Sequence, residues 1–441
     1  MIPLPTLSRG GLLPDDRKTL TRGSAIWNAA LPTQCVVPLH QHAGAAAEAV
    51  VAVGDRVREG MLIGRAVGRN SAHVHAPIPG VVTAIRSGEV YPGRPSACVV
   101  IDLEGEFDRL GKPLAPAEWQ QRSARDLLRN LRECGVVGMA GGGIPADNKY
   151  TIPRGVEIEH LIVNGAESEP YLTATHRLML EKPAEILEGA RIAAHIVGAR
   201  RVTIAVGRDK RDAVAAFRRL VRERGLPFSV RAVSLAYPAG DEKLLIRELV
   251  GREVPAGRLP IDLRVIVSSV ATIHAVYEAI AFGKPVVERV VTVAGSMVRT
   301  PSNVKVRIGT PVGALLAECG GLIDTPARLV LGGPMMGYTV ADMATPITKT
   351  TTGVLALGTD EVNDGERTPC IGCGRCIRVC PVGLEPVTLV KMLERDRPGD
   401  AAAAGLADCR ECGCCSYVCP SHIPLTETLV QGRRRNGGGA P

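Results

Sequence analysis

A pattern of four cysteines followed by proline occurs twice near the end of this 441-residue chain, each time with the spacing C-x2-C-x2-C-x3-C-P. The first run contains Cys370, Cys373, Cys376 and Cys380, and the second contains Cys409, Cys412, Cys415 and Cys419. A [4Fe–4S] cube takes four thiolates, and with this spacing the fourth cysteine of each run ligates the other cluster. We therefore predict one cluster on Cys370, Cys373, Cys376 and Cys419, and another on Cys409, Cys412, Cys415 and Cys380. This part of the chain is predicted to fold around two clusters and to carry electrons.

Other interpretations of the cysteines are weaker. Zinc sites use paired C-x2-C arms with a longer spacer between them, and a disulfide framework has no reason to repeat the trailing proline. Cys414 lies inside the second run at a spacing that does not suit a ligand, so we expect a bystander or a residue that shields the cluster sulfurs. The cysteines outside the runs are predicted to be small buried thiols: Cys35, Cys98, Cys134 and Cys319. Oxygen-sensitive clusters and reduced thiols indicate the cytoplasm.

Length and charge narrow the class of protein further. The chain is long enough for three or four domains, and 45% of its residues are apolar. Its net charge of +8 suits an acidic redox partner or an anionic membrane face. Nucleic acid is a poor candidate partner because only 3% of residues are aromatic and no basic stripe is interleaved with them. We expect neither a signal peptide nor a membrane-spanning helix, since no segment has the required apolar run.

The first part of the chain is predicted to be an arm followed by a β-rich domain. Residues 1–30 are broken by proline and glycine, and we expect this arm to pack on another part of the protein. Residues 31–115 contain short β-branched runs between turns, such as Val50–Val53 and a hairpin-like piece at 76–85. Their Gly-Asp-x-Val-x-x-Gly and Ala-Pro-x-x-Gly-x-Val segments resemble the barrel-sandwich fold of biotinyl and lipoyl carrier domains.

A carrier function is nevertheless excluded, because no lysine occurs between Lys18 and Lys112 to bear the prosthetic group. The same region contains four histidines without supporting carboxylates. Such residues are more often surface or packing residues than metal ligands, and this is the interpretation we adopt for His40, His42, His73 and His75.

Residues 120–288 alternate between strand and helix patterns, which indicates a Rossmann-like parallel sheet. The predicted strands lie at 161–163, 202–206 and 265–267, and the predicted helices at 212–224 and 271–282. Ligands of such sheets bind at the carboxyl ends of the strands. The cofactor site of this domain is therefore expected on the loops that follow the strands.

The last three segments complete a multi-domain α/β and α+β fold. Residues 289–360 return to β-branched runs and turns and are predicted to form a small β-grasp unit. Residues 365–429 are predicted to hold the two clusters, and 430–441 are expected to be a flexible tail whose arginines are solvated.

Three loops of the α/β domain have the residue types that a nucleotide cofactor requires. The glycine-rich loop Gly138–Pro145 lets the backbone approach a planar or phosphorylated ligand. Asn164–Tyr171 follows a predicted buried strand and brings an amide and two carboxylates to the edge of the sheet. Tyr237–Lys243 again places acidic residues after a strand-like run. Each loop also has an ordinary interpretation, as a structural turn, a helix N-terminus complemented by acids or a solvated turn.

In combination these residues resemble the family of C subunits of the Rnf ion-translocating electron-transport complex, over nearly the whole chain. The segments that carry the resemblance are Pro38–His42, Ala76–Pro77, Asn164–Tyr171, Tyr237–Pro238, Glu242–Lys243, Gly332–Gly337, Cys370–Cys376 and Glu411–Pro420. This family is related to the flavin-bearing, NADH-oxidising subunit of respiratory complex I. The resemblance implies a barrel-sandwich domain, a Rossmann-like FMN/NADH domain, an SLBB-like β-grasp domain and a ferredoxin-like helical domain with two [4Fe–4S] clusters.

The resemblance also implies FMN and NAD(H) as cofactors beside the clusters. The glycine loop would hold FMN with Lys149 just beyond it, Asn164 and Glu167 would bond the flavin, and Asp241 and Glu242 would bind NADH. The cofactor-binding residues implied in this way are Gly138, Gly141, Gly142, Gly143, Lys149, Asn164, Glu167, Asp241, Glu242 and Thr272. No catalytic side chain is assigned.

The function implied is that of a peripheral electron-transfer subunit of a ferredoxin:NAD oxidoreductase that translocates ions. The expected partners are the integral-membrane and iron–sulfur subunits of the same complex, with ferredoxin reached through the complex. The expected location is the cytoplasmic face of the cell membrane.

Two alternatives stay open at this point. Ala140 stands where the family has the first glycine of a pair, Ile144 replaces a phenylalanine and Ser269 replaces an asparagine. A chain that has lost its flavin or NADH site through such changes would be an electron wire with clusters alone. The other alternative is an NADH-dependent flavin and iron–sulfur reductase for a different acceptor, similar to the corrinoid reductases.

Overall fold

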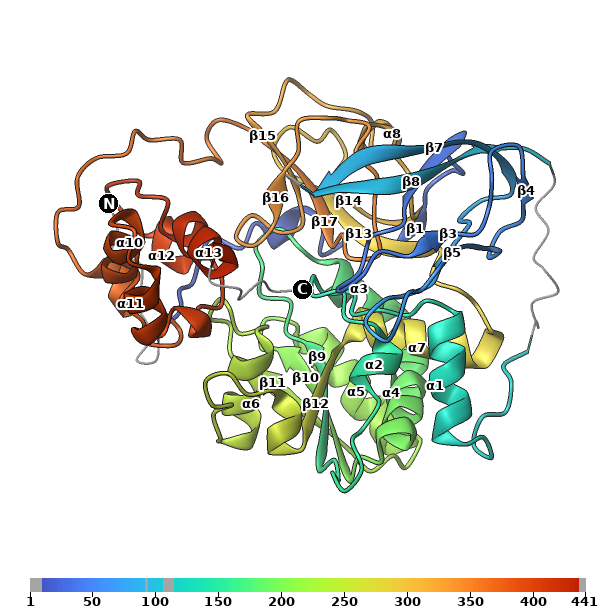
Figure 1. The fold of residues 1–441 in the computed structure, drawn as a ribbon. Coiled ribbons are helices and arrows are strands. Elements are labelled where there is room, and N and C mark those ends of the chain that lie inside the picture. Colours follow the sequence, from blue (N-terminus) through green and yellow to red (C-terminus); the bar gives the residue numbers. More distant parts are fainter. Residues whose placement is uncertain (1–9, 92–93, 106–114, 436–441) are drawn as a thin grey trace.

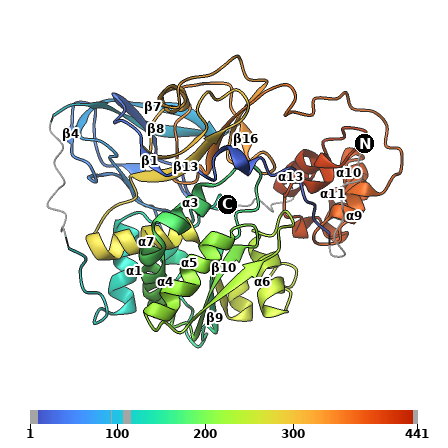
Figure 2. The ribbon, with the colours of Figure 1, turned by 180° about the vertical axis from the view of Figure 1, so that it is seen from behind.

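A computed structural model describes residues 10–91, 94–105 and 115–435. The predictions for the first residues of the arm, for the end of the barrel domain and for the last six residues lie outside these ranges. Figure 1 shows the cluster domain at one end of the molecule, with the two β domains on one side of the α/β domain. The same arrangement is seen from behind in Figure 2.

The α/β domain is built on a four-stranded sheet in the order β11-β10-β9-β12, in which every neighbouring pair is parallel. Its strands are β9 (His160–Gly165), β10 (Arg201–Gly207), β11 (Phe228–Val233) and β12 (Val265–Ser269). Its helices are α1 (Ala124–Glu133), α2 (Ala146–Lys149), α3 (Ala174–Glu181), α4 (Pro183–Val197), α5 (Arg211–Glu223), α6 (Glu242–Val250) and α7 (Val270–Phe282), with the 3-10 turn η2 (Pro260–Leu263). The three predicted strands and the two predicted helices of this domain are confirmed.

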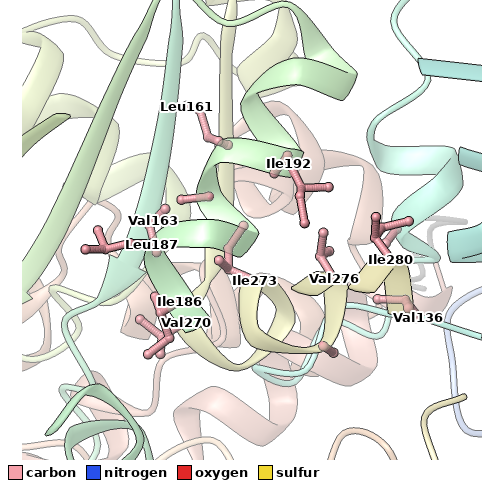
Figure 3. Close-up of a cluster of buried hydrophobic side chains, with 14 of the residues drawn as sticks. Val136, Leu161, Val163, Ile186, Leu187, Ile192, Val270, Ile273, Val276 and Ile280 are labelled. Atoms are coloured by element: carbon pink, nitrogen blue, oxygen red, sulfur yellow. The ribbon is translucent and has the colours of Figure 1, made fainter. Parts of the chain in front are cut away.

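The core of this domain shows why a continuous apolar run forms a central strand. Leu161 and Val163 pack with the helices α4 and α7 on one face of the sheet (Figure 3), whereas Ile162 packs with Leu245 of α6 on the other face. Successive side chains of a strand point to opposite faces, so both faces of β9 are covered. Each fully buried aliphatic side chain of this kind contributes about 1.5–3 kcal/mol relative to exposure.

The barrel-sandwich domain has two small sheets, ordered β2-β8-β7-β4 and β3-β5-β6. Its strands are β2 (Gln34–Pro38), β3 (Glu48–Ala49), β4 (Arg56–Val57), β5 (Leu62–Arg65), β6 (Val74–His75), β7 (Gly80–Tyr91) and β8 (Arg94–Leu103). The hairpin is formed by β7 and β8, later in the chain than the piece predicted at 76–85. The β-branched run at Val50–Val53 is not a strand: Val50 donates one hydrogen bond to the carbonyl of Ile63, and the chain then turns outward, leaving Val53 61% exposed.

The arm and the β-grasp domain share one six-stranded sheet in the order β1-β14-β13-β17-β15-β16. The arm contributes η1 (Lys18–Leu20) and β1 (Trp27–Asn28); the grasp domain contributes β13 (Glu288–Ala294), β14 (Ser302–Arg307), α8 (Val312–Glu318), β15 (Arg328–Leu331), β16 (Tyr338–Thr339) and β17 (Gly353–Leu357). The expectation that the arm packs on another part of the protein is therefore confirmed for its described residues, because β1 pairs in parallel with β14.

The cluster domain consists of short helices joined by the two cysteine loops. They are α9 (Arg375–Val379), α10 (Pro386–Glu394), α11 (Pro398–Ala403), η3 (Leu406–Asp408), α12 (Cys414–Tyr417) and α13 (Leu425–Arg435). The prediction of a flexible tail from residue 430 is wrong as far as residue 435. Helix α13 continues through this segment, because Arg433 donates to the carbonyl of Cys409 at 3.0 Å and pairs with Glu411 at 2.6 Å.

Among the described residues, no helix has the length and apolar character that crossing a bilayer requires.

Candidate functional site

A cavity of about 1000 Å³ lies where the α/β, barrel, grasp and cluster domains meet. All ten residues that the sequence suggested for cofactor binding line it: Gly138, Gly141, Gly142, Gly143, Lys149, Asn164, Glu167, Asp241, Glu242 and Thr272. They come from segments spread over more than a hundred residues, from Gly138 to Thr272, and β9 and β12 bring loops of this set together at one edge of the sheet. The structure therefore unites in one site what the sequence suggested as separate loops.

Backbone hydrogen bonds join the two ends of the glycine loop, and one side chain positions it. The amide of Gly138 donates to the carbonyl of Ile144 at 2.8 Å, and that of Gly143 donates back to Gly138 at 3.1 Å. Gly141 and Gly143 have φ values of 100° and 60°, which side chains disfavour. The hydroxyl of Thr272 accepts from the amide of Met139 at 2.9 Å. Thr272 thus positions the loop from the first turn of α7.

Ser269 caps the helix that carries Thr272. Its hydroxyl accepts from the amide of Thr272 at 3.2 Å, and the two hydroxyls lie 2.9 Å apart. Serine and asparagine are comparable N-caps. The replacement of the family's asparagine at this position therefore leaves the helix end intact.

Asn164 and Glu167 are both engaged within the protein. The side-chain amide of Asn164 donates to the carbonyl of Gly240 at 2.9 Å. The carboxylate of Glu167 accepts from the amides of Thr175 at 2.5 Å and His176 at 3.0 Å, at the start of α3. Glu167 is thus a helix cap, the interpretation that the sequence allowed beside flavin binding. A direct contact of either residue with a flavin stays a prediction.

Two buried lysines that the sequence did not single out orient this loop. Lys210 donates to the carbonyl of Ala166 at 3.0 Å, and Lys18 of the arm donates to the carbonyl of Glu167. Glu167 has φ of 43°, an uncommon conformation for a residue with a side chain. Burial lowers the pKa of Lys18 to about 8. The contact of Lys18 with Glu167 could not be predicted from the sequence, because the two residues are 149 positions apart and no local pattern links them.

Glu169 connects the same loop to the grasp domain. Its two carboxylate oxygens accept from the amides of Met335 at 3.1 Å and Met336 at 3.0 Å. A side chain at Gly333 would come within 2.4 Å of the carboxylate, so only glycine fits this turn. Burial raises the pKa of Glu169 to about 7, above its ordinary value of 4.5.

This shift predicts a pH dependence of stability. The folded protein binds the Glu169 proton more tightly than the unfolded chain does. The contribution of Glu169 to the free energy of unfolding is therefore greatest below about pH 4.5 and is lost as the pH rises through about 7. Glu169→Gln should remove this part of the dependence, on the order of 2–3 kcal/mol. Melting temperatures of both proteins at pH 5 and pH 8 measure it. Parallel pH profiles would contradict the assignment.

The acidic pair at Asp241 and Glu242 lies at the start of α6. Asp241 accepts from the amides of Lys243 and Leu244, and its other oxygen pairs with Arg410 at 2.8 Å. Glu242 pairs with Lys149 at 3.1 Å, so two of the predicted residues bind each other. Arg410 belongs to the second cysteine run. The predicted NADH-binding acids are therefore joined directly to a cluster loop.

Tyr237 makes the second connection between the cavity and the clusters. Its hydroxyl donates to the carbonyl of Cys412 at 2.7 Å, and its backbone pairs with Leu12 of the arm. Cys412 lines the cavity together with Arg410 and Glu411. The cofactor cavity and the second cysteine loop consequently share a wall.

Arg410→Gln should weaken this connection. The side chains of Arg410 and Asp241 are only 23% and 14% exposed. Removing one charge of this pair should therefore lower the free energy of unfolding by about 2 kcal/mol. Anaerobic denaturation followed by cluster absorbance measures the loss. Arg200→Gln is the matched control, because Arg200 and Glu157 are 66% and 64% exposed and such pairs contribute about 0–1 kcal/mol. Equal losses in the two variants would contradict the role of the pair.

The four cysteines predicted to hold one cluster lie around a common cavity. A smaller cavity in the cluster domain is lined by Cys380 of the first run and by Cys409, Cys412, Cys414 and Cys415 of the second. The thiol of Cys414 also lies 4.0 Å from the carbonyl of Tyr237, and its non-ligand role stays a prediction.

Of the ligands predicted for the other cluster, two lie in the apolar core of this domain. Cys376 and Cys419 pack in one hydrophobic cluster, whereas Cys370 is exposed. In the described part of the chain, no three His, Cys, Asp or Glu side chains are close enough to hold a single metal ion. Both ligand sets stay predictions.

His42 and His73 of the barrel domain make side-chain hydrogen bonds. His42 contacts the carbonyl of Ala45 at 2.9 Å and the hydroxyl of Ser71 at 3.2 Å, and His73 accepts from the amide of Ala66 at 3.0 Å. His40 and His42 also line the large cavity, a position that the sequence did not suggest.

Comparison with family models identifies four units along the chain. They are an RnfC barrel sandwich hybrid domain at 7–106, a Nuo51 FMN-binding domain at 131–278, an SLBB domain at 290–339 and a 4Fe-4S dicluster domain at 369–423. The fold class and the prediction of FMN and two [4Fe–4S] clusters are thereby confirmed. The chain is an iron–sulfur flavoprotein, and NAD(H) stays a prediction.

Curated relatives identify the family. The C subunit of the ion-translocating oxidoreductase complex of Rhodobacter capsulatus is 40% identical, over 97% of this chain and 83% of the relative. The C subunit of the proton-translocating ferredoxin:NAD(+) oxidoreductase complex of Clostridium ljungdahlii is 36% identical, over 88% and 84%. The corresponding C subunit from Citrobacter koseri is 38% identical, over 96% of this chain and 60% of that relative. The chain belongs to the family of C subunits of ion-translocating oxidoreductase complexes.

A solved structure supports the fold at a greater distance. The NAD+-reducing [NiFe]-hydrogenase in the H2-reduced state matches with a TM-score of 0.50 and 16% identity, over 72% of this chain and 63% of the other. At this identity the likeness concerns the fold alone.

Proposed function

We propose that this protein is the peripheral electron-transfer subunit of a ferredoxin:NAD oxidoreductase complex that translocates ions. It would pass electrons between NAD(H) and two [4Fe–4S] clusters by way of FMN. Its partners would be the integral-membrane and iron–sulfur subunits of that complex, at the cytoplasmic face of the membrane, with ferredoxin reached through the complex.

The observation that carries the proposal is the shared wall between the cofactor cavity and the second cysteine loop. The ten predicted cofactor residues line the same cavity as Arg410, Glu411 and Cys412. A hydride carries two electrons and a cluster takes one, and FMN supplies the chemistry that converts between them. The protein's own task is to hold the two sites at a short separation. Tyr237 and the Asp241–Arg410 pair do so by bonding one loop to the other.

The residues of the cavity suit a nucleotide. The glycine loop leaves space for a close ligand, since a side-chain carbon at Gly141 or Gly142 would meet nothing within 4 Å. Lys149 lies 23% exposed at the cavity wall and bears a positive charge. The glycine loop lines the cavity and Ser269 still caps the helix beside it. These features favour a working cofactor site over the alternative of an electron wire that has clusters alone.

Anaerobic stopped-flow absorbance with NADH tests the proposal, with flavin quantified on the same reconstituted sample. We expect flavin absorbance to bleach first and the iron–sulfur bands to follow. Clusters that dithionite reduces and NADH does not, in a protein without flavin, would overturn it.

A further inference from the structure

A buried arginine of the grasp domain lies against the glycine loop. Arg289, on β13, is 5% exposed and lines the large cavity. Its guanidinium donates to the carbonyl of Met139 in the glycine loop at 2.9 Å and to the carbonyl of Lys349. Its Nε is buried without a hydrogen-bond partner. Guanidinium has five N–H donors, so two carbonyls leave most of its donor capacity unused.

No carboxylate among the described residues pairs with this charge. The neighbouring Glu288 is on the other face of β13, because successive strand residues alternate. There it pairs with Lys284 at 2.6 Å, Lys305 at 3.5 Å and Arg307 at 3.2 Å.

One of the two residues whose carbonyls Arg289 contacts is a second buried cation. Lys349 is fully buried, and its ammonium donates to the carbonyls of His73 and Gly135, both at 2.7 Å. Burial lowers the pKa of Arg289 to about 9 and that of Lys349 to about 7. A buried cation without a counterion is costly, which indicates that a negative group completes the site when the cavity is filled.

We propose that Arg289 binds and neutralises the phosphate of a nucleotide cofactor seated against the glycine loop. This inference rests on the proposed function. Guanidinium matches phosphate through paired N–H donors, and glycine loops offer free amides to the same group. The phosphate ester of FMN and the pyrophosphate of NAD(H) share this chemistry. The grasp domain would thereby supply a residue to a cofactor site otherwise built by the α/β domain.

The test compares ligands with and without the phosphate. The full chain with its clusters is stripped of flavin and titrated with FMN and with riboflavin, using quenching of flavin fluorescence. Arg289→Gln should lower the preference for FMN over riboflavin roughly 10- to 100-fold, because a charge-assisted bond is lost, while riboflavin affinity stays the same. Arg289→Lys should restore part of the preference.

The second arm distinguishes the source of the phosphate. If Arg289 binds the dinucleotide, the FMN preference stays unchanged, and the dissociation constant of NADH at saturating FMN rises at least about tenfold. Either shift supports the inference. Unchanged binding of both FMN and NADH overturns it while leaving the proposed function intact. A wild-type chain that binds neither nucleotide overturns both.

Arg307→Gln is the matched control for folding. Arg307 lies on the adjacent strand β14 and pairs with Glu59 at 2.9 Å and Glu288 at 3.2 Å. Its replacement should lower the melting temperature and leave the FMN-to-riboflavin preference unchanged. If Arg289 merely held the two carbonyls, Arg289→Gln would behave in the same way.

Discussion

Cys380→Ser should abolish the cluster that is built mainly from the second cysteine run. Cys380 lines one small cavity with Cys409, Cys412 and Cys415, although it belongs to the first run. Losing one of four thiolates leaves an iron without its protein ligand. Iron content of the anaerobic protein should fall from about eight atoms to about four. The electron paramagnetic resonance of the reduced protein should lose the signal of one cluster.

Cys414→Ser provides the control within the same loop. Cys414 is buried and lines the same small cavity, but its thiol lies 4.0 Å from the carbonyl of Tyr237 and its spacing does not suit a ligand. Full iron content is expected in this variant. The contrary outcome for Cys380→Ser is a protein that loses only the signal of the cluster on Cys370, Cys373 and Cys376. That result would contradict the cross-ligation.

Gly142→Ala should reduce flavin binding at least about tenfold without a loss of stability, since a methyl group at the wall of the cavity would displace a ligand in close contact. In the protein alone, a Cβ at Gly142 meets nothing within 4 Å, and Gly142 has no left-handed φ. The substitution therefore affects only what occupies the cavity. Equilibrium titration with FMN and a melting curve measure the two quantities.

Gly399→Ala is the matched control, because Gly399 also has open space around it and lies on α11 in the cluster domain. Flavin affinity should stay at the wild-type value in this variant. A Gly142→Ala protein that binds FMN as tightly as wild type would show that no cofactor approaches this part of the loop.

Local patterns in the sequence were enough to predict much of the fold. The spacing of the cysteines sets which thiolates a tight loop can present to a cluster, and the buried runs at 161–163 and 202–206 are strands because both faces of the sheet are covered. The resemblance to the Rnf C-subunit family added the cofactor residues, and all ten of them line one cavity. These features depend on neighbours along the chain or on motifs, and both can be recognised in a sequence.

Tertiary structure alone decided how these parts are connected. Nothing local distinguishes Glu167 as a helix cap from Glu167 as a flavin ligand, and the difference depends on where α3 begins. Asp241 and Arg410 pair although they are 169 positions apart in the sequence. Arg289 contacts the glycine loop at a residue 150 positions away from it. The energetic effect of a charge depends on its burial and on the partners that packing brings to it. For this reason the sequence by itself determined the fold class, the two clusters and the FMN cofactor, whereas the tertiary structure decided which charges line the cavity.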